Sequence, residues 1–232
     1  MKEYYYMGLD VHKKTVSYCA KAADGRIRDE GVLNAPRATL REWAGELPYM
    51  WVGAMEATLF TGWIYDALEP YALEMKVGHP LRLRAITAAK KKNDRIDART
   101  LADLLRCNLF PECYMASKEI RELRRILRYR NLLVHEAVRM KNKTAGLLME
   151  VGAPYVKQRL HGKRYFSELL CSLEEVPASV IELLKLTRSN MEIFQANQKR
   201  LLDALIAHSE LRERVERLKT IASVGDVTAL TW

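Results

Sequence analysis

The feature that most constrains the fold of this chain is one carboxylate at the end of an apolar run near the N-terminus. Asp10 follows the run Tyr-Tyr-Tyr-Met at 4–7, and an alternating apolar and polar run occupies 15–20. This pattern predicts that Asp10 lies on or beside a strand whose neighbours are largely buried. A carboxylate there is costly unless a partner such as a metal ion compensates its charge. The alternative is an Asp that closes the strand and caps a turn.

Around Asp10, the first half of the chain alternates between extended and helical patterns. Three short strands are predicted within 3–35, and a turn at Asp24-Gly25 precedes the third. The elements predicted after them are a helix over 38–43, an interior strand over 49–55 that ends at Glu56, a helix over 61–68, a strand over 73–77, a helix that His79-Pro80 opens and that continues to Ala89, and a helix over 94–106 with Asn93 as its N-cap. Antiparallel strands followed by strand–helix alternation predict an α/β fold with a mixed sheet flanked by helices.

The second half of the chain carries two long helical patterns with narrow apolar stripes. One runs from Lys118 to about Met149, and the other begins after Pro177 and continues to Leu218. Such stripes are typical of an antiparallel helix pair or of a coiled coil between two chains, and ordinary internal packing gives the same pattern. The last residues, 220–230, restart a helix–turn–helix pattern without a further element to pack against, which predicts the beginning of a truncated domain.

Three further carboxylates are candidates to meet Asp10 in space. Glu56 ends the predicted interior strand, and Asp94 and Asp97 are three residues apart at the start of a predicted helix. That spacing puts both side chains on one helix face, where they repel each other. A divalent cation would relieve the repulsion, because Mg²⁺ prefers oxygen ligands from a few carboxylates together with water and phosphate. The alternative for Asp94 and Asp97 is that they are solvated acids, which the helix dipole favours. For His12 beside Asp10, the alternatives are a group that supports the site and an exposed residue at a strand end.

Basic residues surround these acids and also gather in one later stretch. The bases near the Asp pair are Lys90, Lys91, Lys92, Arg95 and Arg99. Residues 117–164 hold 13 Lys and Arg against four acids, an excess of nine that equals the formal net charge of the whole chain. Within that stretch, one continuous helix face carries Arg121, Arg124, Arg125 and Arg128. A local basic face predicts a polyanionic partner, and acids that hold metal among bases that hold phosphate favour a nuclease-type site.

The composition excludes several classes of protein. The chain of 232 residues is 49% hydrophobic and 29% charged, which is typical of a protein with a buried core. It has no run of about 18 apolar residues, so no transmembrane helix is predicted, and its N-terminus lacks the pattern of a secretory signal. The four cysteines form no C-x-x-C pair, which argues against a zinc ribbon or a disulfide framework. We therefore expect a soluble cytoplasmic protein that does not enter a membrane.

Three motifs resemble a known family. They are Gly-Leu-Asp-Val-His-Lys at 8–13, Met-Glu-Ala-Thr at 55–58 and Lys-Asn-Asp-Arg-Ile-Asp-Ala at 92–98. A strand with an Asp, a later strand with a Glu and a late Asp-x-x-Asp helix are similar to the ribonuclease H-like fold in its RuvC variety. More specifically, the motifs resemble the DEDD transposases of the insertion sequence 110 family, which are relatives of the pilin-gene invertases. The third motif is the most specific of the three.

The resemblance implies a DNA transposase or site-specific recombinase that performs metal-dependent phosphoryl transfer on DNA. Asp10, Glu56, Asp94 and Asp97 would be both the catalytic residues and the ligands of one or two Mg²⁺ ions. The family includes members guided by a bridge RNA that pairs with target and donor DNA. The residues that would hold DNA or RNA are Lys90, Lys91, Lys92, Arg95, Arg121, Arg124, Arg125 and Arg128. The long helices would help to join protomers into a dimer or tetramer.

The resemblance also sets the expected domains. They are a RuvC-like catalytic domain over 1–115, a long-helix, coiled-coil and nucleic-acid-binding region over 116–219, and the start of a truncated C-terminal transposase domain over 220–232. The family's second domain opens with an Ile-Pro-Gly-Ile-Gly-like hairpin, whereas residues 221–225 are Ile-Ala-Ser-Val-Gly, and the family's catalytic serine would lie beyond them. Two alternatives stay open. One is a non-catalytic fragment that binds nucleic acid and dimerises, and the other is an actin-like ATPase, which the short chain and the lack of Gly-rich phosphate loops disfavour.

Overall fold

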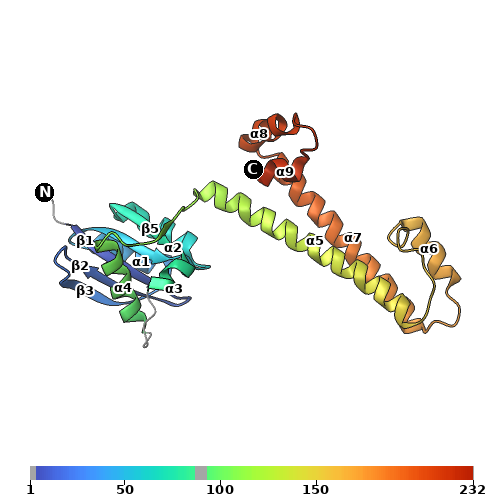
Figure 1. Cartoon of the computed structure of the whole chain (residues 1–232), viewed down its shortest axis with the longest axis horizontal. Helices are drawn as coiled ribbons and strands as arrows, with labels where there is room; N and C mark the ends of the chain where they lie inside the picture. The colour runs from blue at the N-terminus through green and yellow to red at the C-terminus, as the bar shows by residue number, and fades with distance from the viewer. Residues whose placement is uncertain (1–3, 87–92, 232) are drawn as a thin grey trace. The chain divides into compact units, whose positions relative to one another are not determined.

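The computed structural model describes residues 4–86 and 93–231 (Figure 1). By its internal contacts the chain divides into two compact units, Met1–Arg121 and Glu122–Trp232. In the part of the chain that is described, the first unit contains the sheet and the second contains helices alone. Among these same residues, no helix is both long enough and apolar enough to cross a membrane.

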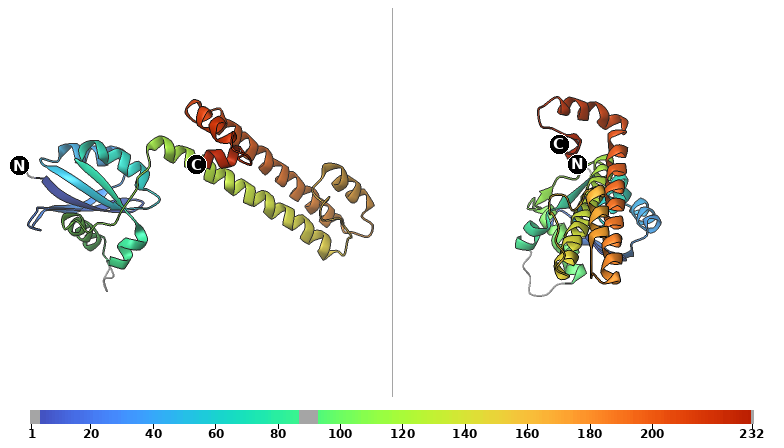
Figure 2. Two further views of the ribbon diagram at one scale, coloured as in Figure 1. Left: turned by 45° about the horizontal axis from the view of Figure 1, so that its top comes forward. Right: turned by 90° about the vertical axis from the view of Figure 1, so that its right-hand side faces the viewer.

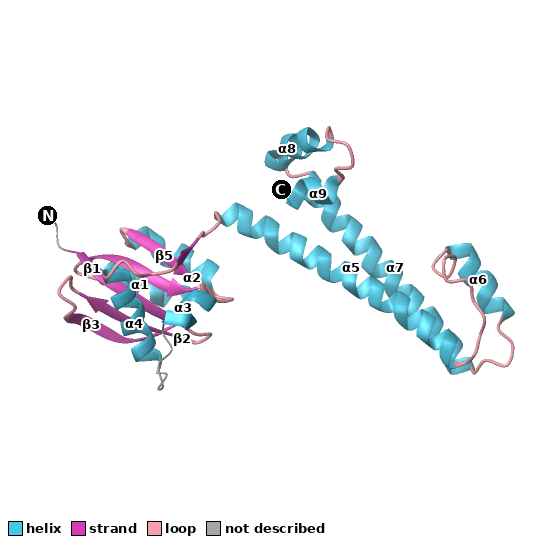
Figure 3. Cartoon of the chain, viewed as in Figure 1, coloured by secondary structure: helices cyan, strands magenta, loops and turns pink. Residues whose placement is uncertain are grey.

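The described part of the first unit contains a mixed sheet of six strands, and Figure 3 shows its strands in magenta. The strands are β1 (Tyr4–Val11), β2 (Thr15–Lys21), β3 (Ile27–Asn34), β4 (Met50–Glu56), β5 (Glu74–Gly78) and β6 (Glu112–Cys113). Their order across the sheet is β3-β2-β1-β4-β5-β6. β1, β4 and β5 are parallel to one another, whereas β2, β3 and β6 each run antiparallel to a neighbour. β1 therefore lies between a hairpin partner and a parallel partner.

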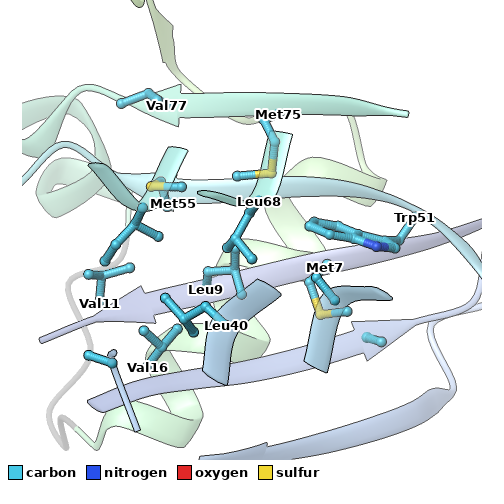
Figure 4. Packing of buried hydrophobic residues seen from close by; sticks show 14 residues of the cluster. Met7, Leu9, Val11, Val16, Leu40, Trp51, Met55, Leu68, Met75 and Val77 are labelled. Atoms are coloured by element: carbon cyan, nitrogen blue, oxygen red, sulfur yellow. The ribbon is translucent and has the colours of Figure 1, made fainter. Parts of the chain in front are cut away.

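Helices cover both faces of this sheet, as Figure 2 shows. They are α1 (Arg37–Glu46), α2 (Thr61–Leu68), the short 3₁₀ helix η1 (Glu69–Tyr71), α3 (Pro80–Ile86) and α4 (Asp94–Arg106). Met7, Leu9 and Val11 of β1 are buried in the main core together with Leu40 of α1 and Leu68 of α2 (Figure 4). α4 packs against β1 and β2. Because successive side chains of a strand point to opposite faces, the even-numbered residues of β1 point toward α4.

The second unit is built around two long helices. Its helices are α5 (Lys118–Glu150), which begins in the first unit, α6 (Lys163–Ser172), α7 (Ala178–Ile206), α8 (Ser209–Lys219) and α9 (Asp226–Thr231). The end of α5 packs with α6 and the first half of α7 in a small core that contains Leu148, Phe166 and Leu184. Beside this core, Thr144 of α5 donates a buried hydrogen bond to Thr187 of α7, with 3.0 Å between the Oγ1 atoms. α8 and α9 pack on each other and on α7.

This architecture confirms the predicted α/β fold, a ribonuclease H-like mixed sheet flanked by helices and followed by long helices. The strands and helices predicted before residue 107 are present, with small shifts at their ends. The part of the third predicted helix that reaches Ala89 lies outside the described residues. β6 and α6 are elements that the sequence did not predict.

Two parts of the helical prediction are wrong. The pattern that begins after Pro177 forms two helices, α7 and α8, with a break at Ala207-His208. Leu205 and Leu211 are six residues apart, which turns an α-helix by about 240°, so one helix could not keep both on one face. The sequence pattern predicts no packing partner for the last residues, yet Ala229 of α9 is buried and α9 contacts α7 and α8.

Candidate active site

Two neighbouring parallel strands bring Asp10 and Glu56 together. The register pairs Leu9 of β1 with Met55 of β4, so Asp10 and Glu56 are the next residues along, at the carboxyl ends of the strands. Leu9 and Met55 are buried in the core with α1 and α2. The pleat therefore points Asp10 and Glu56 to the opposite face, toward α4. In open α/β sheets, the carboxyl ends of the strands are the edge at which ligands bind.

Hydrogen bonds to the backbone hold Glu56 in place where β4 ends. The Ala57 N–H donates to the carbonyl of Gly78 on β5, at 3.0 Å. The Thr61 hydroxyl at the start of α2 donates to the carbonyl of Glu56, at 3.2 Å, and accepts the N–H of Thr58, at 2.6 Å. The Met-Glu-Ala-Thr motif is thus a tight connection from strand to helix, and it fixes the backbone that carries the Glu56 side chain.

The first turn of α4 carries the other two carboxylates. Asn93 caps the helix, since its side-chain oxygen accepts the N–H of Arg95 at 3.1 Å. The backbone carbonyl of Asn93 accepts the N–H of Asp97 at 3.0 Å. Asp94 and Asp97 therefore lie where the helix dipole favours negative charge. The helix starts at the residue that the capping pattern predicts.

Gly8 lets α4 lie close to β1. A methyl group at Gly8 would stand 2.0 Å from the carbonyl oxygen of Ala98 and 2.6 Å from the backbone nitrogen of Ala102. Both are backbone atoms of α4, so no side-chain movement could relieve the overlap. Glycine at this position thus sets the distance between β1 and the helix, and with it the distance between Asp10 and Asp97.

Two ion pairs fix α4 along the sheet. Glu30 of β3 accepts two hydrogen bonds from the Arg99 guanidinium, at 2.7 and 2.6 Å, and these bonds hold the pKa of the Glu30 carboxyl below its usual range. Lys21 of β2 is buried, and its ammonium lies 2.5 Å from the carboxylate of Asp103, one turn further along α4. Arg99, which the sequence placed among the bases around the Asp pair, is therefore occupied by a structural contact.

Three of the four candidate carboxylates line one cavity. Its volume is about 220 Å³, and its lining residues are Asp10, Glu56, Leu83, Arg84, Asp97, Thr100 and Leu101. The three acids come from β1, β4 and α4, which are far apart in sequence. Arg84 of α3 adds a positive charge to this acidic wall. The sequence did not predict Arg84, because nothing in its exposed helix distinguishes it from the neighbouring Arg82.

His12 connects Asp10 to the fourth carboxylate. Its Nε2 atom lies 3.1 Å from Oδ2 of Asp10 and 3.5 Å from Oδ1 of Asp94. One possible ligand atom from each of these three residues lies within 4.8 Å of the other two. The His12 side chain is 52% exposed. It is thus an exposed residue at a strand end that also contacts the site, which combines the two alternatives that the sequence left open.

The electrostatics of the site centre on Asp10. Burial raises the pKa of the Asp10 carboxyl above its usual range, His12 opposes this shift, and the charges of Asp97 and Asp94 add to it. A cation would relieve both the desolvation of Asp10 and the repulsion between the carboxylates. Carboxylate oxygens are also the ligands that Mg²⁺ prefers in proteins. The donor set of the site therefore fits a divalent metal ion.

The residues predicted to bind nucleic acid fall into three groups. Lys90, Lys91 and Lys92 lie outside the described residues. The exposed residues are Arg95, Arg124, Arg125 and Arg128. Arg121 is largely buried instead, because it forms an ion pair with Asp66 of α2 and donates to the carbonyl of Ala116 at 2.7 Å. This structural role at the start of α5 separates Arg121 from Arg124, Arg125 and Arg128, with which it was predicted to bind nucleic acid.

A comparison with models of protein families matches residues 7–152 to a transposase family, the DEDD transposases of insertion sequence 110. The match covers more than half of the chain and includes Asp10, Glu56, Asp94 and Asp97. None of the curated proteins matches the chain. With the matched segment extending from β1 to the end of α5, the chain belongs to the DEDD transposase family of insertion sequence 110.

Proposed function

We propose that this chain is a DNA transposase that cleaves and rejoins DNA by metal-dependent phosphoryl transfer, with Asp10, Glu56, Asp94 and Asp97 as its catalytic acids. One observation carries the proposal: carboxylates from β1, β4 and α4 converge at the carboxyl ends of two parallel strands. Such a group of acids costs free energy unless a cation compensates it, so stability alone does not account for it. Membership of a transposase family supports the same reaction class.

The four acids would hold one or two Mg²⁺ ions. When bound, such ions supply Lewis-acid stabilisation of the oxygens in an in-line displacement at phosphorus. Asp10 connects the other acids of the site. It lines the cavity with Glu56 and Asp97, and it contacts His12, which also contacts Asp94. The backbone bonds around Glu56 and the N-cap of α4 fix the backbone that carries the side chains of Glu56, Asp94 and Asp97.

Other residues of the chain would bind and orient the nucleic acid. Arg84 shares the cavity with the acids and would hold a phosphate oxygen, because a guanidinium offers paired donors to phosphate. Arg95 adds an exposed positive charge at the start of α4. On α5, Arg124, Arg125 and Arg128 suit the backbone of DNA or of a guide RNA alike. The guide RNA enters the proposal through family membership.

We further propose that the long helices join protomers into a dimer or tetramer. α5 and α7 carry large apolar side chains that are exposed in a single chain, and five that are between 45% and 58% exposed are Leu132, Val138, Leu183, Leu186 and Ile193. Exposed apolar surface along a long helix is typical of a helix–helix interface between chains. Analytical ultracentrifugation tests this part of the proposal, and a chain that sediments only as a monomer would contradict it.

The catalytic proposal is tested by the substitution Asp94→Asn, with Asp203→Asn as its control. Asp203 is an exposed acid on α7, so the control removes the same charge outside the acidic site. In the complete protein, Asp94→Asn is expected to abolish Mg²⁺-dependent processing of DNA while the circular dichroism spectrum is unchanged, and Asp203→Asn is expected to keep the activity. Full activity of Asp94→Asn would refute the assignment.

The exposed arginines of α5 favour one other function, binding of nucleic acid without catalysis. That function predicts no DNA processing by the unaltered chain, together with a gel shift that persists when all four acids are changed to their amides. The catalytic proposal predicts Mg²⁺-dependent processing by the complete protein and its loss in the same variant. A DNA-processing assay and a gel-shift assay on the unaltered and the fourfold-substituted protein therefore distinguish the two functions.

A further inference from the structure

Asp10 has two chemically different sets of neighbours. It shares the cavity with Glu56 and Asp97, whose side chains offer only oxygen. It also contacts the imidazole of His12, which in turn contacts the carboxylate of Asp94. The possible ligand atoms of Asp10, His12 and Asp94 all lie within 4.8 Å of one another, so small adjustments let them converge on a single ion.

We propose that His12 is a metal ligand and that the site has two unequal positions. The oxygen-only position is formed by Asp10, Glu56 and Asp97, and the mixed position is formed by Asp10, His12 and Asp94. This inference rests on the proposed function. An imidazole nitrogen is a softer ligand than a carboxylate oxygen, and the transition ions of the first row bind it better than Mg²⁺ does. The mixed position therefore prefers Mn²⁺ or Co²⁺, whereas the oxygen-only position suits Mg²⁺.

Hydrogen bonds hold the backbone around His12 in place, and they fix the position from which its side chain extends. The His12 N–H donates to the carbonyl of Thr15 at 2.9 Å and closes the turn between β1 and β2. The carbonyl of Lys14 in the same turn accepts the N–H of Ala35, also at 2.9 Å. The turn is thus held by one hydrogen bond within it and by another to the segment after β3. The exposed half of the imidazole leaves a path by which an ion reaches Nε2.

A plain ion pair accounts less well for this geometry. A protonated imidazole donates one hydrogen bond from Nε2, so it satisfies either Asp10 or Asp94 but not both. In the structure, the same Nε2 atom faces an oxygen of each carboxylate. Ligation of one ion would use Nε2 of His12 together with the carboxylate oxygens of Asp10 and Asp94. The ion would also balance the negative charges of these two carboxylates.

The experiment uses Mn²⁺, because its unpaired electrons report on a directly bound nitrogen. Pulsed electron paramagnetic resonance of the whole chain with Mn²⁺ is expected to detect coupling to an imidazole nitrogen, and His12→Gln is expected to abolish it. His135→Gln, which removes an exposed imidazole from α5, is the control and should keep the coupling. In titration calorimetry, His12→Gln should weaken the binding of Mn²⁺ by about tenfold and that of Mg²⁺ by clearly less.

The outcomes separate this inference from the proposed function. If Mn²⁺ binding is lost in Asp10→Asn but the unaltered chain gives no nitrogen coupling, the inference fails and the proposed function survives. Coupling that persists in His12→Gln, or an equal loss of affinity for both ions, overturns the inference in the same way. If neither ion binds the unaltered chain at millimolar concentration, both the inference and the metal-dependent function fail.

Discussion

At the scale of residues, the ionised carboxylate of Asp10 lies in an unfavourable environment. Burial raises the pKa of its carboxyl, and the charges of Asp97 and Asp94 act in the same direction. When the pKa of an acid is higher in the folded than in the unfolded state, its stabilising contribution is greatest at low pH and disappears as the pH rises through the folded-state pKa. Without a cation, ionisation of the Asp10 carboxyl therefore destabilises the fold.

The substitution Asp10→Asn is expected to raise the midpoint of thermal unfolding of the metal-free chain at neutral pH, because Asn has the same shape without the charge. Mg²⁺ should reverse this order. At a concentration one hundred times its Kd, a bound ion stabilises the unaltered chain by about 2.7 kcal/mol, and the variant should gain much less. Calorimetry with a chelator and then with Mg²⁺ measures both effects. A lower midpoint for the variant under chelation would contradict this account of Asp10.

At the scale of single residues, the sequence reveals chemistry but not contacts. The four acids could be singled out as candidates because each is of a type that binds metal and each lies in a short motif. The contact between His12 and Asp94 could not be predicted, since it joins segments that are far apart in the chain. Arg99 shows the reverse case. Its position among bases near the acids suggested a phosphate contact, and only the fold reveals that Glu30 already neutralises it.

At the scale of elements, the site depends on how closely α4 lies against β1. The substitution Gly8→Ala puts a methyl group into the backbone of α4 at Ala98 and Ala102. We expect the helix to move outward, with a loss of stability of about 3 kcal/mol and weaker binding of Mg²⁺, because Asp97 moves with the helix. Urea unfolding followed by circular dichroism and calorimetric titration with Mg²⁺ measure the two effects.

The chain supplies a matched control for this prediction. Gly146 lies inside α5, and a methyl group there would meet no atom within 4 Å. Gly146→Ala is therefore expected to stabilise the second unit by about 1 kcal/mol through helix propensity and to leave Mg²⁺ binding unchanged. If Gly8→Ala left both the stability and the Mg²⁺ affinity unaltered, this result would contradict the conclusion that the site depends on the close packing of α4 on β1.

Elements were predictable where the chain carries a local signal. Asn93 marks the start of α4, and the predicted range of that helix agrees with the structure. β6 has two residues, too few for any periodicity, and α6 lies between Gly162 and Pro177, where helix breakers obscure its pattern. The register that sets Leu9 beside Met55 depends on long-range pairing, which no local pattern encodes.

At the scale of the whole molecule, the positive charge is concentrated in one stretch of the chain. The excess of basic residues in 117–164 equals the net charge of +9. Arg124, Arg125 and Arg128 are exposed on α5, and among the described residues no acid lies within ion-pair distance of them. A helix that serves only as a solvated surface normally balances such charges with acids. These three arginines are therefore free to neutralise phosphates.

The last prediction concerns the salt dependence of DNA binding when these three arginines are all changed to Ala. Each arginine that no longer neutralises a phosphate should reduce the slope of log K against log salt concentration by about 0.9, so the triple variant should show a slope smaller by about 2.7. The control changes Lys199, Arg200 and Arg212 to Ala, which are exposed on α7 and α8 and remove the same total charge. Fluorescence anisotropy of a labelled duplex over a series of KCl concentrations measures the slopes. If the control reduced the slope as much as the α5 variant, binding would respond to net charge alone and the localised basic face would be refuted.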